Sequence, residues 1–354
     1  MMARRRGLVW ALAALALSAC ATPGAPFTPR PVGLPEAEAA LVWPAPPEVP
    51  RFRFGGRLLG EANYPAPTDG GAGRRFLRWL AGIDDGSARP RTLVRPQSGL
   101  VDARGRILVT DVGRQAVFVF DAEAGLQVWE RADAKAQFVS PLGIAAGPDG
   151  QFLVADAELA RVIRLDGDGN PLGSLGREVL KRPTGLARDA VSGRLYVADT
   201  AAHDIKVFDD GGRLVATLGR QGTEPGQFNG PTHLAFADGR LFVSDTLNAR
   251  VQVIAPDGAP IAEVARRGLY LGNVVRPKGV AVDGQGHIYV VEGYYDYLLV
   301  YDAGGRLLLP IGGTGHTAGK FFLPGGVWTD AAQRIYVADV FNGRIEIFQA
   351  LAGK

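Results

Sequence analysis

Cysteine, methionine and histidine are scarce in this chain of 354 residues, which holds one Cys, two Met and four His. A single cysteine excludes a disulfide framework and a four-cysteine zinc site. A real excess of positive charge is also missing. The formal net charge of +3 is supplied by residues 4–6, Arg-Arg-Arg; of 39 basic residues, 39 − 3 = 36 remain, against 36 acidic ones. Without a block of clustered Lys and Arg we expect no nucleic-acid partner.

The apolar run near the N-terminus is too short to cross a bilayer. Residues 7–19 form an uncharged run of 13 residues behind the three arginines, whereas a membrane-spanning helix needs roughly 20 apolar residues. Basic residues, a short apolar segment and small residues at its end are typical of a secretory signal. We therefore interpret residues 1–19 as a signal peptide and exclude them from the fold.

Residues 17–20, Leu-Ser-Ala-Cys, resemble the lipobox of bacterial lipoproteins. The resemblance implies cleavage before Cys20 and attachment of lipid to it, so that acyl chains hold the mature protein on a membrane. Ala21 follows the cysteine, and in these lipoproteins an Asp at that position favours retention at the inner membrane. The outer membrane, with the protein facing the periplasm, is accordingly expected. An ordinary secretory signal with an incidental cysteine is the alternative.

A proline-rich segment follows. Nine of the thirty residues from 21 to 50 are Pro, a composition that favours extended polyproline-II structure. We interpret residues 20–50 as the lipidated cysteine and a tether. The alternative, an arm that packs on the folded body, is open around Leu41, Val42 and Trp43.

The rest of the chain repeats. Leu-Tyr-Val-Ala-Asp at residues 195–199 recurs with small changes, and its final acid recurs at spacings of 45, 43, 46, 47 and 47 residues. The six acids are Asp111, Asp156, Asp199, Asp245, Glu292 and Asp339. Periods of this length indicate repeat architectures. A Pro-x-Gly-like start precedes most of these acids, and a third apolar run and a turn follow them, as expected for four-stranded antiparallel units.

Six such units predict an all-β fold, a six-bladed β-propeller over residues 51–350. The sixth unit lacks room for a fourth strand after Phe348, and residues 51–60 have the pattern of the missing strand. We therefore predict that this N-terminal strand closes the last blade and removes an exposed sheet edge. Residues 74–81 predict a short amphipathic helix.

The repeats resemble those of the NHL-repeat family of six-bladed propellers. The motifs that carry the resemblance are Pro-Thr-Gly-Leu-Ala (183–187), Leu-Tyr-Val-Ala-Asp-Thr (195–200), Asp-Thr-Leu-Asn-Ala-Arg-Val (245–251) and Asp-Val-Phe-Asn-Gly-Arg-Ile (339–345). The family includes enzymes, RNA binders and interaction scaffolds, so the resemblance implies the fold and leaves the function open.

The recurring acids are expected to be structural, because a ring needs the same turn six times whereas catalysis needs one asymmetric site. Amidating lyases with this propeller bind zinc through histidines just after the repeat proline, and here His233 alone matches. The sequence also lacks the Gly-x-Ser-x-Gly elbow of serine hydrolases and the Cys-x-x-Cys-His motif of haem attachment. We predict no catalytic residues, no metal and no cofactor.

Cations and aromatic residues are left as candidates for binding. Arg95, Arg182 and Arg276 precede the repeat proline in alternate blades, with Lys278 and His233 near the same rim. Such a ring of cations can hold a carboxylate or a phosphate; the alternative is that each Arg pairs with a local acid. Separately, Tyr294 and Tyr295 interrupt the fifth repeat, either exposed at the propeller mouth or packed between blades 5 and 6.

The sequence thus favours a non-enzymatic binding or scaffold protein of the bacterial envelope. Its membrane contact is lipid on Cys20, and its partner is a protein, peptide, glycan or small anionic ligand at the propeller mouth. A metal-dependent lyase or lactone hydrolase with a site in the central channel is the alternative.

Overall fold

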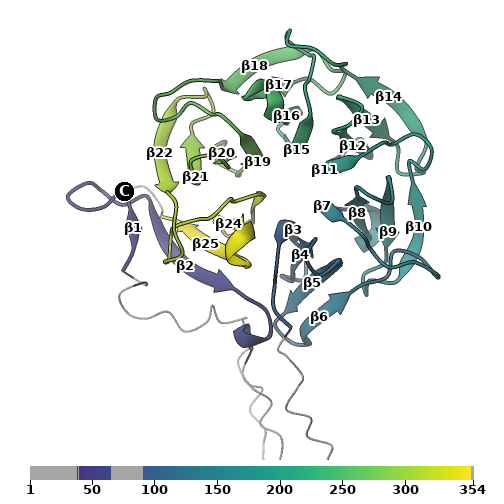
Figure 1. The fold of residues 1–354 in the computed structure, drawn as a ribbon, viewed down its shortest axis with the longest axis horizontal. Coiled ribbons are helices and arrows are strands. Elements are labelled where there is room, and N and C mark those ends of the chain that lie inside the picture. Colours follow the sequence, from purple (N-terminus) through teal and green to yellow (C-terminus); the bar gives the residue numbers. More distant parts are fainter. Residues whose placement is uncertain (1–37, 39, 65–90, 352–354) are drawn as a thin grey trace, which may run out of the picture.

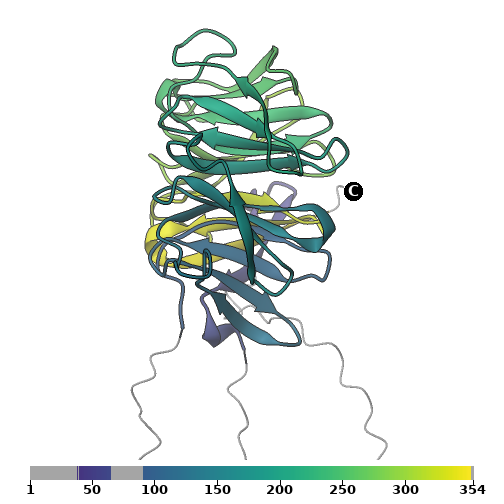
Figure 2. The same cartoon turned by 90° about the vertical axis from the view of Figure 1, so that its right-hand side faces the viewer.

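Six antiparallel sheets stand around a central channel in the computed structural model, which describes residues 38, 40–64 and 91–351. Figure 1 looks down the channel, with the first strands of the blades nearest the centre, and Figure 2 shows the ring from the side. The predicted six-bladed β-propeller with four-stranded blades is confirmed. In the described ranges no helix has the length and apolar character that a membrane span requires.

In blades 1 to 5 the four strands follow one another along the chain from the channel outward. They are β3 (Pro96–Val101), β4 (Ile107–Asp111), β5 (Ala116–Asp121) and β6 (Gly125–Trp129); β7 (Pro141–Ala146), β8 (Phe152–Asp156), β9 (Arg161–Leu165) and β10 (Pro171–Leu175); β11 (Pro183–Asp189), β12 (Arg194–Asp199), β13 (Asp204–Phe208) and β14 (Leu214–Leu218); β15 (Pro231–Ala237), β16 (Arg240–Asp245), β17 (Arg250–Ile254) and β18 (Pro260–Ala265); β19 (Pro277–Val282), β20 (Ile288–Glu292), β21 (Tyr297–Tyr301) and β22 (Leu307–Gly312).

Blade 6 has five strands in the order β23 (Val327–Thr329), β24 (Arg334–Asp339), β25 (Arg344–Ala350), β2 (Phe52–Leu58) and β1 (Val42–Trp43). Four short 3₁₀ helices complete the elements: η1 (Glu61–Asn63), η2 (Pro148–Gly150), η3 (Thr246–Asn248) and η4 (Val340–Asn342).

The glycine of the Pro-x-Gly start lets neighbouring blades approach each other at the channel. A Cβ added at Gly185 would lie 2.6 Å from the carbonyl oxygen of Thr232 in the next blade, and one at Gly279 would lie 2.5 Å from the amide nitrogen of Val327. Any side chain at these positions would push two inner strands apart. The glycine of the repeat therefore allows close packing between these neighbouring blades, in addition to its place in the strand pattern within each blade.

The hydrophobic core is divided among the interfaces between adjacent blades. Between blades 3 and 4, for example, Tyr196 and Val207 of one blade pack with Leu234 and Val243 of the next. Five further clusters of this kind lie at the other interfaces around the ring. Both faces of the middle strands are thus buried, which explains their near-continuous apolar sequences.

The N-terminal strand closes the ring, as predicted. β2 pairs antiparallel with β25, with Phe54 opposite Phe348, so the last blade is completed from the other end of the chain. β1 then pairs with β2 through Val42 and Trp43, and the Trp43 ring meets Phe348 edge-on at 5.3 Å between centroids. Of the two alternatives for residues 41–43, the structure shows the packed arm.

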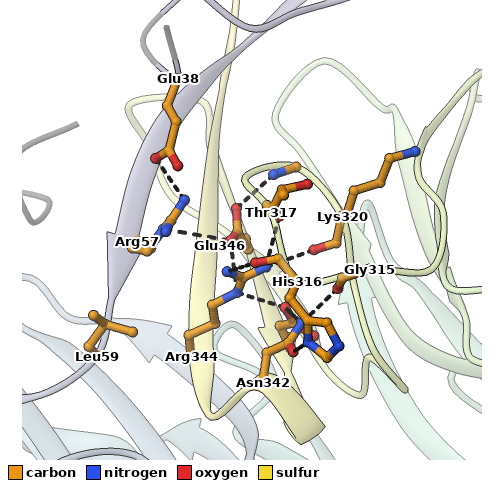
Figure 3. Close-up of polar contacts among 12 residues, drawn as sticks. Glu38, Arg57, Leu59, Gly315, His316, Thr317, Lys320, Asn342, Arg344 and Glu346 are labelled. Atoms are coloured by element: carbon orange, nitrogen blue, oxygen red, sulfur yellow. Dashed lines mark hydrogen bonds and ion pairs between the residues drawn. The ribbon is translucent and has the colours of Figure 1, made fainter. Parts of the chain in front are cut away.

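An ion-pair network lies across this closure (Figure 3). Arg57 of β2 is bonded to Glu38 at 2.8 Å and lies 3.8 Å from Glu346 of β25. Glu346 also pairs with Arg344 at 2.9 Å, and Arg344 pairs with the repeat acid Asp339 at 2.8 Å. The Glu346 side chain is fully buried. Charged groups therefore join the N-terminal strand to the last blade across its buried face.

Two predictions lie outside the described residues. The expected helix at residues 74–81 is one, and the lipidated Cys20 with its signal peptide is the other.

Candidate functional site

The six repeat acids accept hydrogen bonds from the loop that enters each blade. All six are buried, with at most 1% of each residue exposed. Asp156, for example, accepts hydrogen bonds from the amides of Val139 and Ser140, just before the repeat proline, and from Leu159 in its own turn. The expectation of a structural role agrees with this geometry. The six carboxylates are spread around the ring and do not form one site.

The same hydrogen bonds place three arginines at the channel mouth. In blades 1, 3 and 5 one of the amides that donate to the repeat acid belongs to the arginine itself, as in Arg95 with Asp111 at 3.1 Å. Arg182 donates in the same way to Asp199 at 2.8 Å. Arg276 has Glu292 as its acceptor. Each main chain is held at the rim while its guanidinium is exposed.

A cavity of about 240 Å³ opens at this mouth between blades 5, 6 and 1. Arg95, Arg276, Lys278 and His233 line it. A second cavity of about 310 Å³ continues it into the channel, sharing His233 and Lys278 and adding Arg182. The structure thus brings together all five cationic or imidazole residues singled out from the sequence.

Their charges are compensated to different degrees. Arg182 pairs with Glu158 of the neighbouring blade at 3.1 Å, which is the local pairing considered from the sequence. The side chains of Arg95, Arg276 and Lys278 make no hydrogen bond or ion pair with any described residue. Among the described residues that line the two cavities, none is acidic. The mouth is therefore lined by basic residues, of which only Arg182 has an ion-pair partner among the described residues.

His233 and Lys278 lie deeper than the arginines. Burial, and secondly the charge of Lys278, lower the pKa of His233 to about 3, so its imidazole is neutral near pH 7. Its Nδ1 lies 3.1 Å from the hydroxyl of Thr232. Burial also lowers the pKa of Lys278, with Arg276 as the second cause. The other blades have glycine where His233 stands, except that blade 1 has Ser98, so this imidazole breaks the symmetry of the ring.

The two predicted tyrosines are exposed beside the mouth. Tyr294 is 61% and Tyr295 45% exposed, and their rings meet edge-on at 4.8 Å between centroids. Neither lines the cavities; the apolar residues that line the outer cavity include Leu323 and Phe341. Tyr294 and Phe341 occupy equivalent positions in their repeats, because each stands two residues after the repeat acid.

The other histidines are engaged elsewhere. His203 accepts the amide of Gly230 at 3.0 Å, His287 pairs with Asp283 at 3.0 Å, and His316 is bonded to Asn342. Within the described ranges no three His, Cys, Asp or Glu side chains gather in a way that could hold a metal ion.

Comparisons with known proteins agree with this architecture. The model of the NHL repeat matches residues 180–208, which end with the third strand of blade 3. NHL repeat-containing protein 3 of Homo sapiens is 28% identical over 167 residues, covering 41% of this chain and 46% of that protein. The match therefore spans about half the length of this relative.

Solved structures share the fold. A streptogramin B lyase superposes with a TM-score of 0.55 at 15% identity, covering 75% of this chain and 85% of that one. A gluconolactonase from Xanthomonas campestris gives a TM-score of 0.56 at 18% identity, covering 73% and 87%. Likeness at this level concerns the fold alone. The chain therefore forms a six-bladed β-propeller that contains an NHL repeat in blade 3 and is similar over part of its length to NHL repeat-containing proteins.

Proposed function

We propose that this protein is a non-enzymatic binding protein of the bacterial envelope, held on a membrane by lipid on Cys20, and that its channel mouth binds a small anionic ligand. The observation that carries the ligand class is the charge of Arg95 and Arg276, whose side chains have no ion-pair partner among the described residues, beside a cavity whose described lining holds no acidic residue. Guanidinium groups bind carboxylate and phosphate through paired N–H donors. A partly enclosed site of one sign of charge also concentrates ligands of the opposite sign.

The place of the protein in the cell rests on the sequence. Residues 17–20 supply the lipobox pattern, and Ala21 favours the outer membrane as the destination. The propeller would then face the periplasm at the end of a proline-rich tether. Tyr294 and Tyr295, exposed beside the mouth, offer apolar surface to a larger ligand that carries the anion, such as a peptide or a glycan.

Calorimetric titration with citrate and with inorganic phosphate, at low salt, tests the binding site. We expect Arg95→Ala and Arg276→Ala each to weaken binding by about tenfold, which corresponds to about 1.4 kcal/mol. Arg213→Ala is the matched control, because Arg213 is 81% exposed in the hairpin between β13 and β14. Equal affinities in all four proteins, or no binding of either anion, would refute the site.

The alternative, a metal-dependent lyase or lactone hydrolase, is favoured by the kinds of enzyme among the structures that share the fold. A catalytic zinc takes about three protein ligands, and His233 is the one imidazole among the described residues lining the two cavities. Elemental analysis of the purified protein decides between the two functions. One zinc or calcium per chain, removed by chelation together with lactone hydrolysis, would replace the binding function by the enzymatic one.

A further inference from the structure

Lys278 is the least exposed cation of the mouth. It follows Pro277 at the start of β19 and lines both the outer and the inner part of the cavity. Its stem passes Gly293, where an added Cβ would lie 3.2 Å from the Lys278 Cγ. The absence of a side chain at Gly293 therefore leaves room for the lysine. Its amine has no hydrogen-bond or ion-pair partner among the described residues.

The charged side chains that line the two cavities together with Lys278 are all basic. Arg276 precedes it on the same loop, Arg95 enters from blade 1, Arg182 from blade 3, and the neutral His233 from β15. Glu292, the acid of the same blade, directs its oxygens to the amides of residues 275, 276 and 294 and not to the amine. A lysine beside another cation and shielded from water is more easily deprotonated, and burial and Arg276 accordingly lower its pKa.

A deprotonated amine is a nucleophile, and the cations around it attract anions. We propose that the Lys278 amine captures a small anionic aldehyde or ketone as a reversible imine, with Arg95 and Arg276 binding the anionic group. This inference rests on the proposed anion site and adds a covalent step to it. The ligand class is then a keto acid or a phosphorylated carbonyl compound.

The step balances without any further reagent. The amine lone pair forms a bond to the carbonyl carbon, and a proton passes from the nitrogen to the carbonyl oxygen to give a carbinolamine. This hydroxyl then leaves with a second proton as water while the nitrogen forms the C=N bond. Hydrolysis reverses the sequence, so the ligand is released unchanged and the capture remains binding.

The chain offers its own controls, because it contains six lysines. Lys206 pairs with Asp204 at 2.6 Å, and Lys320 donates to the carbonyl of Gly312 at 2.7 Å. Lys135 and Lys181 are exposed. Lys354 lies outside the described residues. Lys135 and Lys181 therefore report the background reactivity of exposed amines.

Pyridoxal 5′-phosphate tests the proposal on the full-length protein in detergent, since it joins an aldehyde to a phosphate. Brief exposure at pH 7.5 followed by borohydride converts an imine to a stable amine, and peptide mass mapping locates it. We expect labelling of Lys278 to exceed that of Lys135 at least tenfold. Arg95→Ala should reduce labelling by this reagent several-fold, and reduce labelling by pyridoxal, which has no phosphate, much less.

Two variants separate chemistry from folding. Neither Lys278→Arg nor Lys278→Met can form an imine at position 278; in both, the total label incorporated per protein should fall to the background of Lys135 and Lys181 while the thermal transition is kept. If Lys278→Arg alone unfolds, Lys278→Met and the wild-type peptide map still decide. Labelling of Lys278 at the rate of Lys135 would overturn the imine.

Pyridoxine 5′-phosphate, which lacks the aldehyde, separates this proposal from the underlying site. Calorimetric binding of this compound without selective labelling of Lys278 by the aldehyde leaves an anion site and refutes the covalent step. No binding and no selective labelling would refute both. Selective labelling that pyridoxine 5′-phosphate suppresses would support both.

Discussion

Glu346 in blade 6 occupies the position that Gln252 occupies in blade 4. Gln252 accepts the amide of Gly226 at 3.0 Å and stands two residues after Arg250, and Glu346 accepts the amide of Gly319 at 3.2 Å two residues after Arg344. The same side-chain acceptor for a loop amide thus appears twice, once as a neutral carboxamide and once as a carboxyl group. In blade 6 the closing strand β2 covers it and contributes Arg57.

Replacing Glu346 by Gln should therefore change the pH dependence of stability without changing the fold. Burial is the largest cause that raises the pKa of Glu346 from 4.5 to about 7; Asp339 adds to it, and Arg344 and Arg57 act against it. The folded protein then holds this proton more tightly than the unfolded chain. The stabilising contribution is full below about pH 4.5 and is lost as the pH rises to about 7, up to about 3 kcal/mol.

Melting temperatures of wild type and Glu346→Gln between pH 5 and pH 8 check this prediction. We expect the wild type to lose stability relative to the variant as the pH rises through this window. Gln252→Glu in blade 4 is the reciprocal change and should introduce a loss of the same sign. A difference between wild type and Glu346→Gln that stays constant with pH would contradict the raised pKa of Glu346.

The closing strand supplies a second prediction, through two neighbouring residues on opposite faces. Phe54 is 3% exposed and packs on Phe348, whereas Arg53 is exposed. Phe54→Ala leaves a cavity between blades 5 and 6 and should lower the free energy of unfolding by about 3–5 kcal/mol. Arg53→Ala should change it by no more than about 0.5 kcal/mol. Urea unfolding followed by tryptophan fluorescence measures both, and equal midpoints would show that the strand is dispensable.

Much of this architecture was predictable because it repeats. The spacing of the six acids gives the number of blades, and the missing last strand points to residues 51–60. The buried carboxyl group of Glu346 was not predictable in this way, since its burial depends on β2 covering β25, two strands far apart in the sequence. A glutamate between Ile345 and Ile347 has the alternation of a solvent-facing residue.

At the channel mouth, too, some features were predictable from the sequence and others were not. Its cations follow from the residue before each repeat proline, but the pairing of Arg182 with Glu158 depends on how two blades meet. The contribution of Phe341 to the cavity was missed, although its place two residues after the repeat acid is readable in an alignment of the six repeats. Positions relative to the acid therefore contain more information than the motif residues alone.

The lipid anchor gives a third prediction, outside the described part of the chain. Because Cys20 is the one cysteine of the sequence, Cys20→Ser should abolish labelling by a radioactive or clickable palmitate and shift the protein from the membrane fraction to soluble or uncleaved forms. Ser18→Ala is the control, since a small residue is kept at that position. Lipid labelling that persists in Cys20→Ser would refute the lipobox.

The repeat acids supply the last prediction, because Asp111 binds a loop that carries an arginine at the mouth and Asp156 binds a loop that carries a serine there. Asp111 accepts the amides of Val94 and Arg95, and Asp156 accepts those of Val139 and Ser140. Replacing either by Asn keeps the shape but removes the charge from a buried acceptor, which should cost about 1–3 kcal/mol of stability. Asp111→Asn should also loosen the main chain that carries the Arg95 guanidinium and weaken citrate binding several-fold.

Asp156→Asn should leave citrate affinity unchanged, because Ser140 brings no cation to the mouth. Thermal unfolding and calorimetric titration of the two variants, at a temperature where both are fully folded, measure the two effects separately. Equal stability losses with a loss of affinity in Asp111→Asn alone mean that the acid positions the arginine for its ligand. Equal affinities would mean that the turn holds the blade together and that the Arg95 side chain finds the anion without help from Asp111.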